Sequence, residues 1–470
     1  MVAVKRTPGL FGPCVLAALL AVLVVPVWAE QATGGKLPAF PGAEGFGSDS
    51  VGGRGGKVVK VTTLKSDGPG SFKWALEQTY PRIIVFDVSG VIRVTGAKSR
   101  ITVTNPRLTI AGQTAPGAGI TIDGCLVFTG SGDRPMEDLI LRFLRVRPDF
   151  HGAHATGGDC IRVGGGRGSR SDQRVILDHV SVAWSTDEAV QFSAGGTMQW
   201  SACEGSAIAW EGHHCHNYGP YFYACKLPQT LHHSLIAHST ERCPAQSVTP
   251  LLDMRNCVVY NCWPGVQLGN SNAVANYLKE GPGGPQSMRP NLPPIRPARP
   301  GLAQHRRGKA YAAGNVLKPL RGPIEKLPDK GDAPTPAAKV TTQSAEEAYR
   351  MVLAHAGCLP RDAVSRKAFA EARTGTGFMG RYAPAGGLMQ GLTPTKAPKD
   401  ADNDGMPDDW EKAHKLNPND PADNNGIVPA GASKDDRHKG YTWIEFYVND
   451  CADRLIAEAI AEAAAEPNAR

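Results

Sequence analysis

Residues 174–184 read RVILDHVSVAW, a short apolar run rich in the β-branched side chains that are typical of strands. Runs of the same kind recur along the chain, and their starts are Val175, Thr197, Thr230, Leu252 and Asn272. The steps between these starts are 22, 33, 22 and 20 residues, and the long step contains an extra segment, Glu211–Pro220. Such a period without a helical pattern predicts a solenoid, in which each coil buries its inward side chains by stacking on the next coil.

Short runs of this type fill residues 57–279 and are bounded by Gly, Asn, Asp or Pro, so we predict an all-β fold with the architecture of a parallel β-helix. A β-sandwich would also contain many short strands, but it would not need a nearly constant period. Residues 72–77, which follow Ser71, predict a short N-terminal helix that caps the open end of the solenoid. Ser344 predicts a second helix start, and the alanine-rich segment 453–466 predicts a terminal helix.

The N-terminus has the features of a secretory signal peptide. Lys5 and Arg6 precede an apolar run, Val15–Val25, and residues 27–29 supply a cleavage site. The run is too short to span a bilayer. We therefore expect a signal peptide at 1–29 and a secreted protein, extracellular or periplasmic, with no membrane association after cleavage.

The expected compartment determines how the cysteines are interpreted. Ten of the eleven cysteines remain once Cys14 is removed, and eight of them lie between Cys125 and Cys262. In an oxidising compartment an even number of clustered cysteines predicts disulfides. The alternative is a set of buried thiols that act as small hydrophobic residues.

Composition divides the rest of the chain. We assign the β-helix domain to residues 30–325, a helical or irregular extension and linker to 326–395, and a calcium-loop segment with the terminal helix to 396–470. Within the first of these, Gly281–Arg307 is rich in Pro, Gly and Arg and indicates a linker or a long surface excursion.

Residues 400–411 read DADNDGMPDDWE and match a twelve-residue calcium loop. Calcium binds six to eight oxygens, and the ligands that the pattern predicts are Asp400, Asp402, Asp404, the Met406 carbonyl, Asp408 and Glu411. The preceding residues cannot form an entering helix because they include Pro398, so the loop is dockerin-like or thrombospondin-like. We predict a structural calcium here, and the alternative is a solvated acidic turn.

Three stretches of the predicted solenoid carry reactive groups: GDCIRV at 158–163, LDHVSVAWSTDE at 177–188 and LHHSLIAHSTERCP at 231–244. Successive coils stack about 4.8 Å apart, so acids on neighbouring coils can share one hard cation. We expect that cation to be bound by Asp159, Asp187 and Glu188, and we expect Arg242 to face the same groove.

These stretches resemble the pectate lyases of polysaccharide lyase family 1, as do PRIIVFDVSG at 81–90 and AGQTAPG at 111–117. The resemblance runs from about residue 39 to about residue 285 and resumes at 314–316. It implies a right-handed parallel β-helix and the cleavage of polygalacturonate by calcium-assisted β-elimination, with an arginine as the base.

The resemblance also implies roles for single residues. In the family the catalytic arginine lies ten residues after the first histidine of a paired-histidine strand, and His232 plus ten is Arg242. The family's calcium ligands match Asp159 and Glu188, and the adjacent Asp187 is our third ligand. The implied cofactor is therefore Ca²⁺.

The implied chemistry accounts for these residue types. β-Elimination removes a proton from C5, next to the uronate carboxylate, and calcium stabilises the negative charge that develops there. The base must be neutral, whereas the unperturbed pKa of arginine lies above about 12. Neighbouring cations and a desolvated groove would favour neutral Arg242, and the resemblance implies an alkaline optimum.

The chain departs from the family pattern at two places. Ala245 follows Pro244 where the family often has a second arginine, and His213-His214-Cys215 stands where the family often has a lysine. The candidates for binding the substrate carboxylates in their place are Arg255, Lys226 and His216. The histidine-rich run also admits a zinc site, but adjacent ligands rarely point at one metal.

Two other functions compete with a secreted lyase acting on homogalacturonan. One is a hydrolase of the polygalacturonase type on the same scaffold, which would need two carboxyl groups flanking the scissile bond. The other is a catalytically weak or dead β-helix protein that binds acidic polysaccharide. The net charge of +7 without a long Lys or Arg block favours a polyanionic carbohydrate over nucleic acid, and we expect a monomer.

Overall fold

The computed structural model describes residues 37–95, 99–131, 134–148, 158–165, 172–205, 218–262, 265–285, 295–296, 302–304, 308–318, 333–377, 386–433 and 436–465. The predicted signal peptide at 1–29, most of the Pro/Gly/Arg-rich segment, and the histidine-rich run with His216 lie outside the described residues. Within the described residues, no helix is long and apolar enough to cross a membrane.

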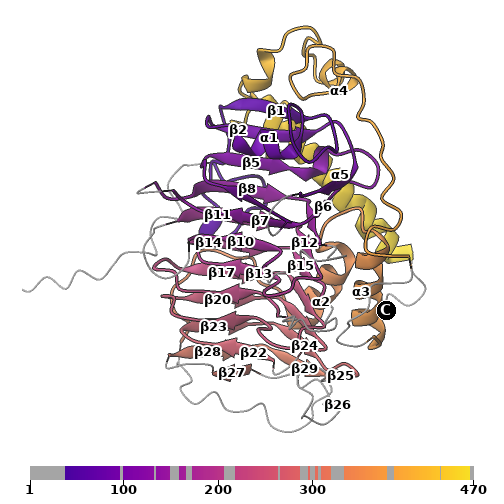
Figure 1. Ribbon diagram of the computed structural model, residues 1–470. Helices are drawn as coiled ribbons and strands as arrows, with labels where there is room; N and C mark the ends of the chain where they lie inside the picture. Colours follow the sequence, from indigo (N-terminus) through magenta and orange to yellow (C-terminus); the bar gives the residue numbers. More distant parts are fainter. Residues whose placement is uncertain are drawn as a thin grey trace, which may run out of the picture.

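Three parallel sheets wrap around one core in the described part of the chain (Figure 1). Each coil passes from a ten-stranded sheet to a nine-stranded sheet and then to an eight-stranded sheet, before the next coil repeats the order. Every pairing between neighbouring coils in these sheets is parallel, as between β11 (Gln173–Asp178) and β14 (Gly196–Gln199). The prediction of a parallel β-helix is confirmed.

The ten-stranded sheet consists, in spatial order, of β1 (Lys57–Val61), β2 (Arg82–Phe86), β5 (Leu108–Ala111), β8 (Glu137–Arg142), β11, β14, β17 (Gln229–His232), β20 (Leu252–Arg255), β23 (Ser271–Val274) and β28 (Ala310–Ala313). The nine-stranded sheet consists of β3 (Gly90–Arg93), β6 (Ile120–Asp123), β9 (Arg145–Val146), β12 (Ser181–Val182), β15 (Ala202–Cys203), β18 (Leu235–Ala237), β21 (Val258–Tyr260), β24 (Tyr277–Lys279) and β29 (Val316–Lys318). The eight-stranded sheet consists of β4 (Arg100–Val103), β7 (Cys125–Phe128), β10 (Ile161–Val163), β13 (Val190–Phe192), β16 (Tyr221–Phe222), β19 (Ala245–Gln246), β22 (Val266–Leu268) and β27 (Leu302–Gln304). A separate antiparallel pair is formed by β25 (Gly284–Pro285) and β26 (Ile295–Arg296).

The predicted repeat agrees with the observed register to within one residue. Thr197 pairs with Ile176 on one side and with Thr230 on the other, so the predicted start at Val175 lies one residue early. Leu252 is early by the same amount, because it pairs with Gln229. A shift of one residue reverses the face of a strand: Val175 and Leu252 point into the core, whereas the hydroxyls of Thr197 and Thr230 accept hydrogen bonds from the N-terminal segment outside.

The core is a continuous apolar column inside the three sheets. All nine cysteines that the structure describes are buried free thiols, and five of them lie in this column. The thiols of Cys160, Cys257 and Cys262 donate to backbone carbonyls instead. The prediction of disulfides is therefore wrong for the described cysteines. Those in the column serve as inward-facing side chains of the coils: Cys160, Cys203, Cys243, Cys257 and Cys262.

The helices lie outside the column or at its end. α1 (Phe72–Glu77) covers the core of the first coil, and the Ser71 hydroxyl caps it by accepting from the amide of Trp74. Ser344 caps α2 in the same way, so both predicted helix starts are confirmed. The predicted terminal helix is real but begins ten residues earlier than expected, and α3 was not predicted. The remaining helices are η1 (Gly45–Gly47), η3 (Gly112–Thr114), α2 (Ala345–His355), α3 (Ala363–Thr374), α4 (Asp408–Ala413), η4 (Asp423–Asn425) and α5 (Trp443–Ala465).

The C-terminal segment returns along the outside of the solenoid. Figure 1 shows α4 beside the first strands and α5 running down the flank of the stack, with α2 and α3 beside the later coils. Outward residues of β2, Ile83 and Val85, form an apolar cluster with Met406, Ile444 and Val448. A second apolar cluster joins α2 and α3 to the outer face of the nine-stranded sheet. The extension is thus packed against the β-helix at both places.

A row of aromatic and imidazole rings fills the space between the solenoid and α2. The ring of His355 stacks on Trp200 at 4.3 Å between centroids, and Trp200 stacks on His233 at 4.2 Å. His355 is buried, and this burial, together with the neighbouring His179, lowers its pKa to about 3. The native protein therefore holds His355 neutral under conditions in which the unfolded chain would protonate it.

We predict that His355→Phe flattens the loss of stability in acid. Below about pH 6.5 the unfolded state binds a proton that native His355 does not. Each further drop of one pH unit therefore lowers the free energy of unfolding by up to roughly 1.4 kcal/mol from this group. Chemical unfolding of wild type and variant from pH 8 to pH 4.5 measures this slope. Equal slopes for the two proteins would contradict the assignment, whatever their difference at pH 8.

Candidate active site

The turns that lead from the nine-stranded sheet into the eight-stranded sheet stack in register over four coils. Parallel bridges join Glu188 to Tyr218 and Tyr218 to Glu241. The amide of Cys160 donates to the carbonyl of Glu188 at 3.2 Å. The preceding coil, which carries Cys160, is therefore in register with the other three. Residues separated by more than 80 positions in the sequence are thereby brought to one corner of the solenoid.

Three carboxylates converge at this corner. One oxygen each from Asp159, Asp187 and Glu188 lies within 4.8 Å of the others. Asp159 and Glu188 are buried, and Asp187 is partly exposed. Asp159 Oδ1 also accepts the amide of Glu188 at 3.2 Å, which fixes the two acids relative to each other.

Arg242 lies beside this acid cluster. Its guanidinium makes an ion pair with Glu188 Oε1 and packs against two tyrosine rings, at 4.3 Å from the centroid of Tyr218 and 4.4 Å from that of Tyr221. Its side chain is one-quarter exposed. Burial lowers the pKa of Arg242, while Asp187 and Asp159 act against that shift.

The acid cluster has the donor set that a hard cation requires. Burial raises the pKa of Asp159 to about 6, against the lowering effect of Arg162, and Asp187 raises it further. The second oxygen of Glu188 is buried without a hydrogen-bond partner. A buried carboxylate oxygen without a partner, next to two further carboxylates, fits a divalent cation that binds oxygen.

Comparison with known proteins identifies the family. The protein called probable pectate lyase C from Aspergillus fumigatus is 31% identical to this chain over 466 residues, which cover 92% of this chain and 98% of the fungal protein. The protein of the same name from Emericella nidulans is 31% identical over 446 residues, with 88% and 92% covered. The chain belongs to the pectate lyase family. No family model matches this pectate lyase chain.

Solved structures are more distant. The pectate lyase Bsp165PelA from Bacillus sp. N165, in complex with trigalacturonate, aligns with 67% of this chain and 98% of its own at 17% identity and a TM-score of 0.43. The family assignment of this pectate lyase therefore rests on the fungal relatives.

The structure separates the residues predicted to bind the substrate carboxylates from this corner. Arg255 ends β20 in the ten-stranded sheet, where its Nε donates to Asp253 at 2.8 Å and its Nη1 to Thr342 at 3.4 Å. Lys226 is exposed and follows β16, whereas Arg242 precedes the neighbouring strand β19, so the two flank opposite ends of adjacent strands. Arg255 forms a contact to the segment before α2, and its role in substrate binding stays a prediction. His216 stays untested.

Arg162 is a residue of this corner to which the sequence analysis gave no role. Its Nε donates to Asp159 Oδ2 at 3.0 Å, its Nη2 donates to Gln191 at 2.9 Å, and its side chain is 39% exposed. Alternation in GDCIRV could have indicated this, because Ile161 and Val163 point inward and the residue between them must point outward. Tyr218 and Tyr221 were missed because no local pattern relates them to Arg242.

Three of the acids in the predicted calcium loop lie close together, and Asp408 makes other contacts. Carboxylate oxygens of Asp400, Asp402 and Asp404 lie within 4.8 Å of one another. Asp408 is not part of this group: its carboxylate pairs with Lys399 at 2.6 Å and accepts the amide of Ala401 at 2.8 Å. Asp408 as a ligand stays a prediction, and in this structure its carboxylate closes the loop.

Two further acids and Met406 lie beside these three carboxylates or within the loop. Glu411 lies within 4.8 Å of Asp404 and of Asp423, which the sequence analysis did not consider. The side chain of Met406 is buried in the apolar cluster against β2, and its amide donates to Asp404 at 2.8 Å. The role of the Met406 carbonyl stays a prediction.

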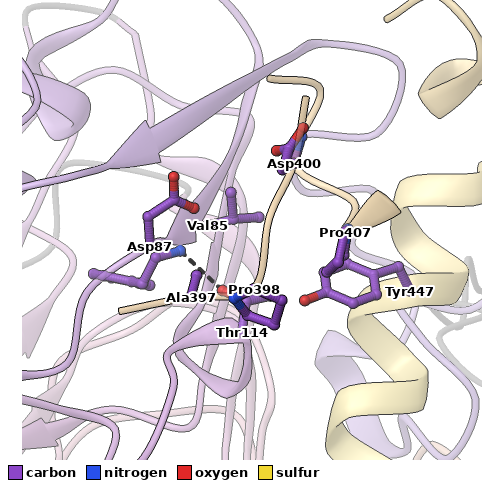
Figure 2. Close-up of a pocket in the computed structure, with 10 residues that line it drawn as sticks. Val85, Asp87, Thr114, Ala397, Pro398, Asp400, Pro407 and Tyr447 are labelled. Carbon is purple, nitrogen blue, oxygen red and sulfur yellow. Dashed lines mark hydrogen bonds between the residues drawn. The ribbon is translucent and has the colours of Figure 1, made fainter. Parts of the chain in front are cut away.

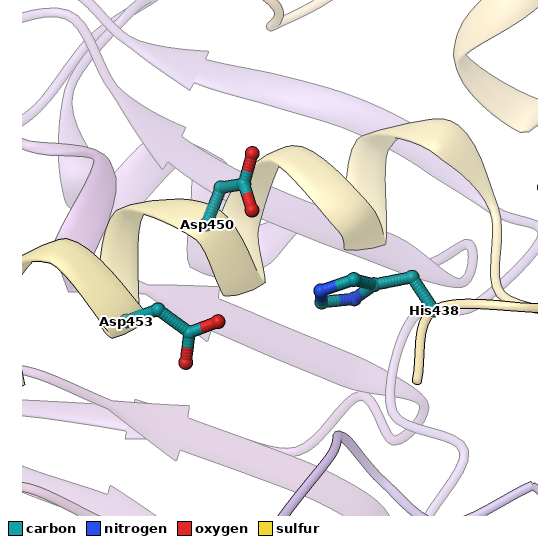
Figure 3. A group of neighbouring side chains, drawn as sticks. All are labelled: His438, Asp450 and Asp453. Atoms are coloured by element: carbon teal, nitrogen blue, oxygen red, sulfur yellow. The ribbon is translucent and has the colours of Figure 1, made fainter. Parts of the chain in front are cut away.

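A further pair of acidic residues on α5 already has hydrogen-bond partners within the protein. Figure 3 shows Asp450 and Asp453 projecting from the helix toward His438. Asp450 accepts the indole N–H of Trp410 at 3.0 Å, and Asp453 accepts from Arg437 at 2.8 Å. These carboxylates are engaged in holding the segments around α5 together.

Proposed function

We propose that this chain is a secreted, calcium-dependent pectate lyase that cleaves homogalacturonan by β-elimination to unsaturated oligogalacturonates. The convergence of Asp159, Asp187 and Glu188 within 4.8 Å, with the Arg242 guanidinium on Glu188, supports this most directly. Membership of the pectate lyase family supports the reaction class. Secretion rests on the features of the N-terminal segment.

The acid cluster would hold the calcium. Calcium bound there would neutralise the uronate carboxylate and lower the cost of negative charge at the adjacent carbon. The chain prepares for this by burying two of the three acids and by fixing Asp159 to the amide of Glu188 at 3.2 Å. Oxygen ligands held in place before binding cost little reorganisation when charge develops nearby.

Arg242 would be the group that accepts the proton from C5 of a bound galacturonate. The rings of Tyr218 and Tyr221 cover its guanidinium, which limits access of water and supports the lowered pKa. Glu188 holds the guanidinium at the acid cluster, so base and acids meet the same sugar unit. A base is useful only within reach of the proton that it removes.

Arg162 would bind a second substrate carboxylate. It lies on an outward row of the eight-stranded sheet in which Arg162, Gln191, Tyr221 and Ala245 pair in succession. Ala245 occupies the position where family members often have their second arginine, and Arg162 offers a guanidinium on the same row. Arginine suits this role because its fork of donors matches a carboxylate.

The geometry favours this function over the two alternatives. Hydrolysis by paired carboxyl groups needs a separation of about 5–9.5 Å, so that a sugar bond or a water fits between them, whereas these three acids crowd toward one point. A binding protein without activity would have no need for a shielded guanidinium at the acid cluster. An activity assay on polygalacturonate separates a lyase from a hydrolase and from an inactive binding protein.

We predict that the protein forms a product with ultraviolet absorbance from polygalacturonate, and that Arg242→Lys lowers the rate about 10²–10⁴-fold, the usual contribution of general base catalysis. Excess EGTA is expected to abolish the absorbance, and calcium to restore it. Arg255→Lys is the matched control, since Arg255 also pairs with a carboxylate, that of Asp253, but lies on a different sheet, and it should retain activity.

The outcomes separate the candidate functions. Reducing ends without absorbance would identify a hydrolase, and binding of polygalacturonate without either signal would identify a binding protein. Full activity of Arg242→Lys, with an unchanged melting temperature, would remove the base assignment.

For substrate binding we predict that Arg162→Gln raises KM for polygalacturonate roughly tenfold with a smaller change in kcat, because a charge-assisted hydrogen bond is lost. The matched control is Arg93→Gln, which removes an exposed arginine paired with Asp123 at 3.1 Å on the nine-stranded sheet. A KM change of the same size in both variants would mean that general charge, and not the position of Arg162, governs binding.

A further inference from the structure

The C-terminal loop contains buried carboxylate oxygens that have no hydrogen-bond partner. These oxygens are Asp402 Oδ2, Asp404 Oδ2, both carboxylate oxygens of Glu411, and Asp423 Oδ1. Glu411 has 0% of its surface exposed and Asp404 has 3%. A fully buried glutamate that makes no hydrogen bond with either oxygen is costly unless a ligand compensates it.

The unpartnered oxygens face one another. Asp400, Asp402 and Asp404 form one group within 4.8 Å, and Asp404, Glu411 and Asp423 form a second group within the same limit. Asp404 belongs to both groups, so the two groups adjoin at this residue.

Asp423 reaches these acids from a separate turn of the chain. It begins η4, twelve residues after Glu411, and its second oxygen accepts the amide of Asn417 at 3.2 Å. The next residue, Asn424, donates from its side chain to the carbonyl of Asp404 at 3.0 Å. Two hydrogen bonds therefore hold Asp423 in position over the loop.

We propose that one calcium ion binds among Asp400, Asp402, Asp404, Glu411 and Asp423, and that it fastens the C-terminal segment to the first coils of the β-helix. Asp423 takes the place that the loop pattern would give to Asp408. This site is separate from the acid cluster at Arg242, and the inference does not rest on the proposed function.

The chemistry of the five ligands favours calcium. Calcium accepts six to eight oxygens in flexible geometry, whereas magnesium requires near-octahedral geometry and retains several waters. Five carboxylates drawn from three consecutive short segments form a crowded, all-oxygen and strongly negative site. A divalent ion would satisfy the unpartnered oxygens and offset the mutual repulsion of the acids.

Several contacts connect this loop to the solenoid. Lys60 on β1 bridges Asp400 at 2.7 Å and Asp87 at 2.9 Å, and the amide of Ala397 donates to the carbonyl of Asp87 at 3.0 Å. Figure 2 shows Asp87 and Val85 of the first coils facing the extended segment that carries Ala397 and Asp400.

The loop also fixes apolar groups against the same coils. Gly405 in the middle of the loop has a φ of 98°, and a Cβ there would come within 2.7 Å of Val58 on β1. The adjacent Met406 is fully buried against β2 and α5. Order in the loop is therefore transmitted to the packing of α5 on the first coils.

The test uses the full-length protein and calcium alone as the ligand. At a calcium concentration about 100-fold above Kd, we expect the melting temperature of the EGTA-treated protein to rise by at least about 3 °C. Asp423→Asn is expected to lose more than half of this rise. Asp409→Asn is the matched control, because its side chain is 97% exposed and pairs only with Lys412 among the described residues.

A second readout does not depend on stability. Terbium bound among these acids should show luminescence on excitation of the indole of Trp410, the residue before Glu411. Asp423→Asn and Glu411→Gln should weaken terbium binding at least tenfold, while Asp409→Asn and Asp408→Asn leave it within about twofold.

Asp159→Asn distinguishes this site from the acid cluster beside Arg242, and it should keep both signals. Loss of both signals in Asp159→Asn with their retention in Asp423→Asn would overturn the proposal, since the ion would then bind at the groove. A wild-type melting temperature that calcium and EGTA leave unchanged, without terbium luminescence, would overturn it as well.

Discussion

Stacking of parallel coils at about 4.8 Å is the constraint on which the rest of this structure depends. It turns distant positions in the sequence into neighbours, as it does for Cys160, Glu188, Tyr218 and Glu241 at one corner of the solenoid. The coil interior supplies the rigidity, because its apolar column continues from the first coil to the last. Side chains that emerge from such a corner are held by the backbone ladder and need few further contacts to stay in place.

The corner concentrates charge of both signs where water is partly excluded. Two buried acids and one partly exposed acid face a guanidinium that is covered by two tyrosine rings. Arg162 and Arg242 each contact one of the acids, so the acid cluster is balanced by cations that also face the groove. Under the proposed function, a polyanionic sugar chain would offer carboxylates both to the arginines and to a bound cation, which would account for the mixture of charges.

Much of this arrangement could be predicted from the sequence, because strand period and acid position are local signals. The period at 174–277 predicted the solenoid, and the stacking of neighbouring coils, together with the family resemblance, predicted the cluster of Asp159, Asp187 and Glu188. The register was off by one residue at Val175 because adjacent apolar residues there gave no sign of which one points inward. That Arg255 lies away from the acid cluster could not be foreseen for a related reason: the sequence does not show at which of three corners a coil exposes a residue. Asp423 was missed because it joins its loop through the fold and not through spacing.

A crystal structure of the Arg242→Lys variant with calcium and an oligogalacturonate tests the central claim most directly. The account predicts one calcium ion in contact with Asp159, Asp187, Glu188 and a sugar carboxylate, with C5 of that sugar facing residue 242. An oligosaccharide bound on another sheet, or an ion at this corner without contact to the sugar, would contradict it.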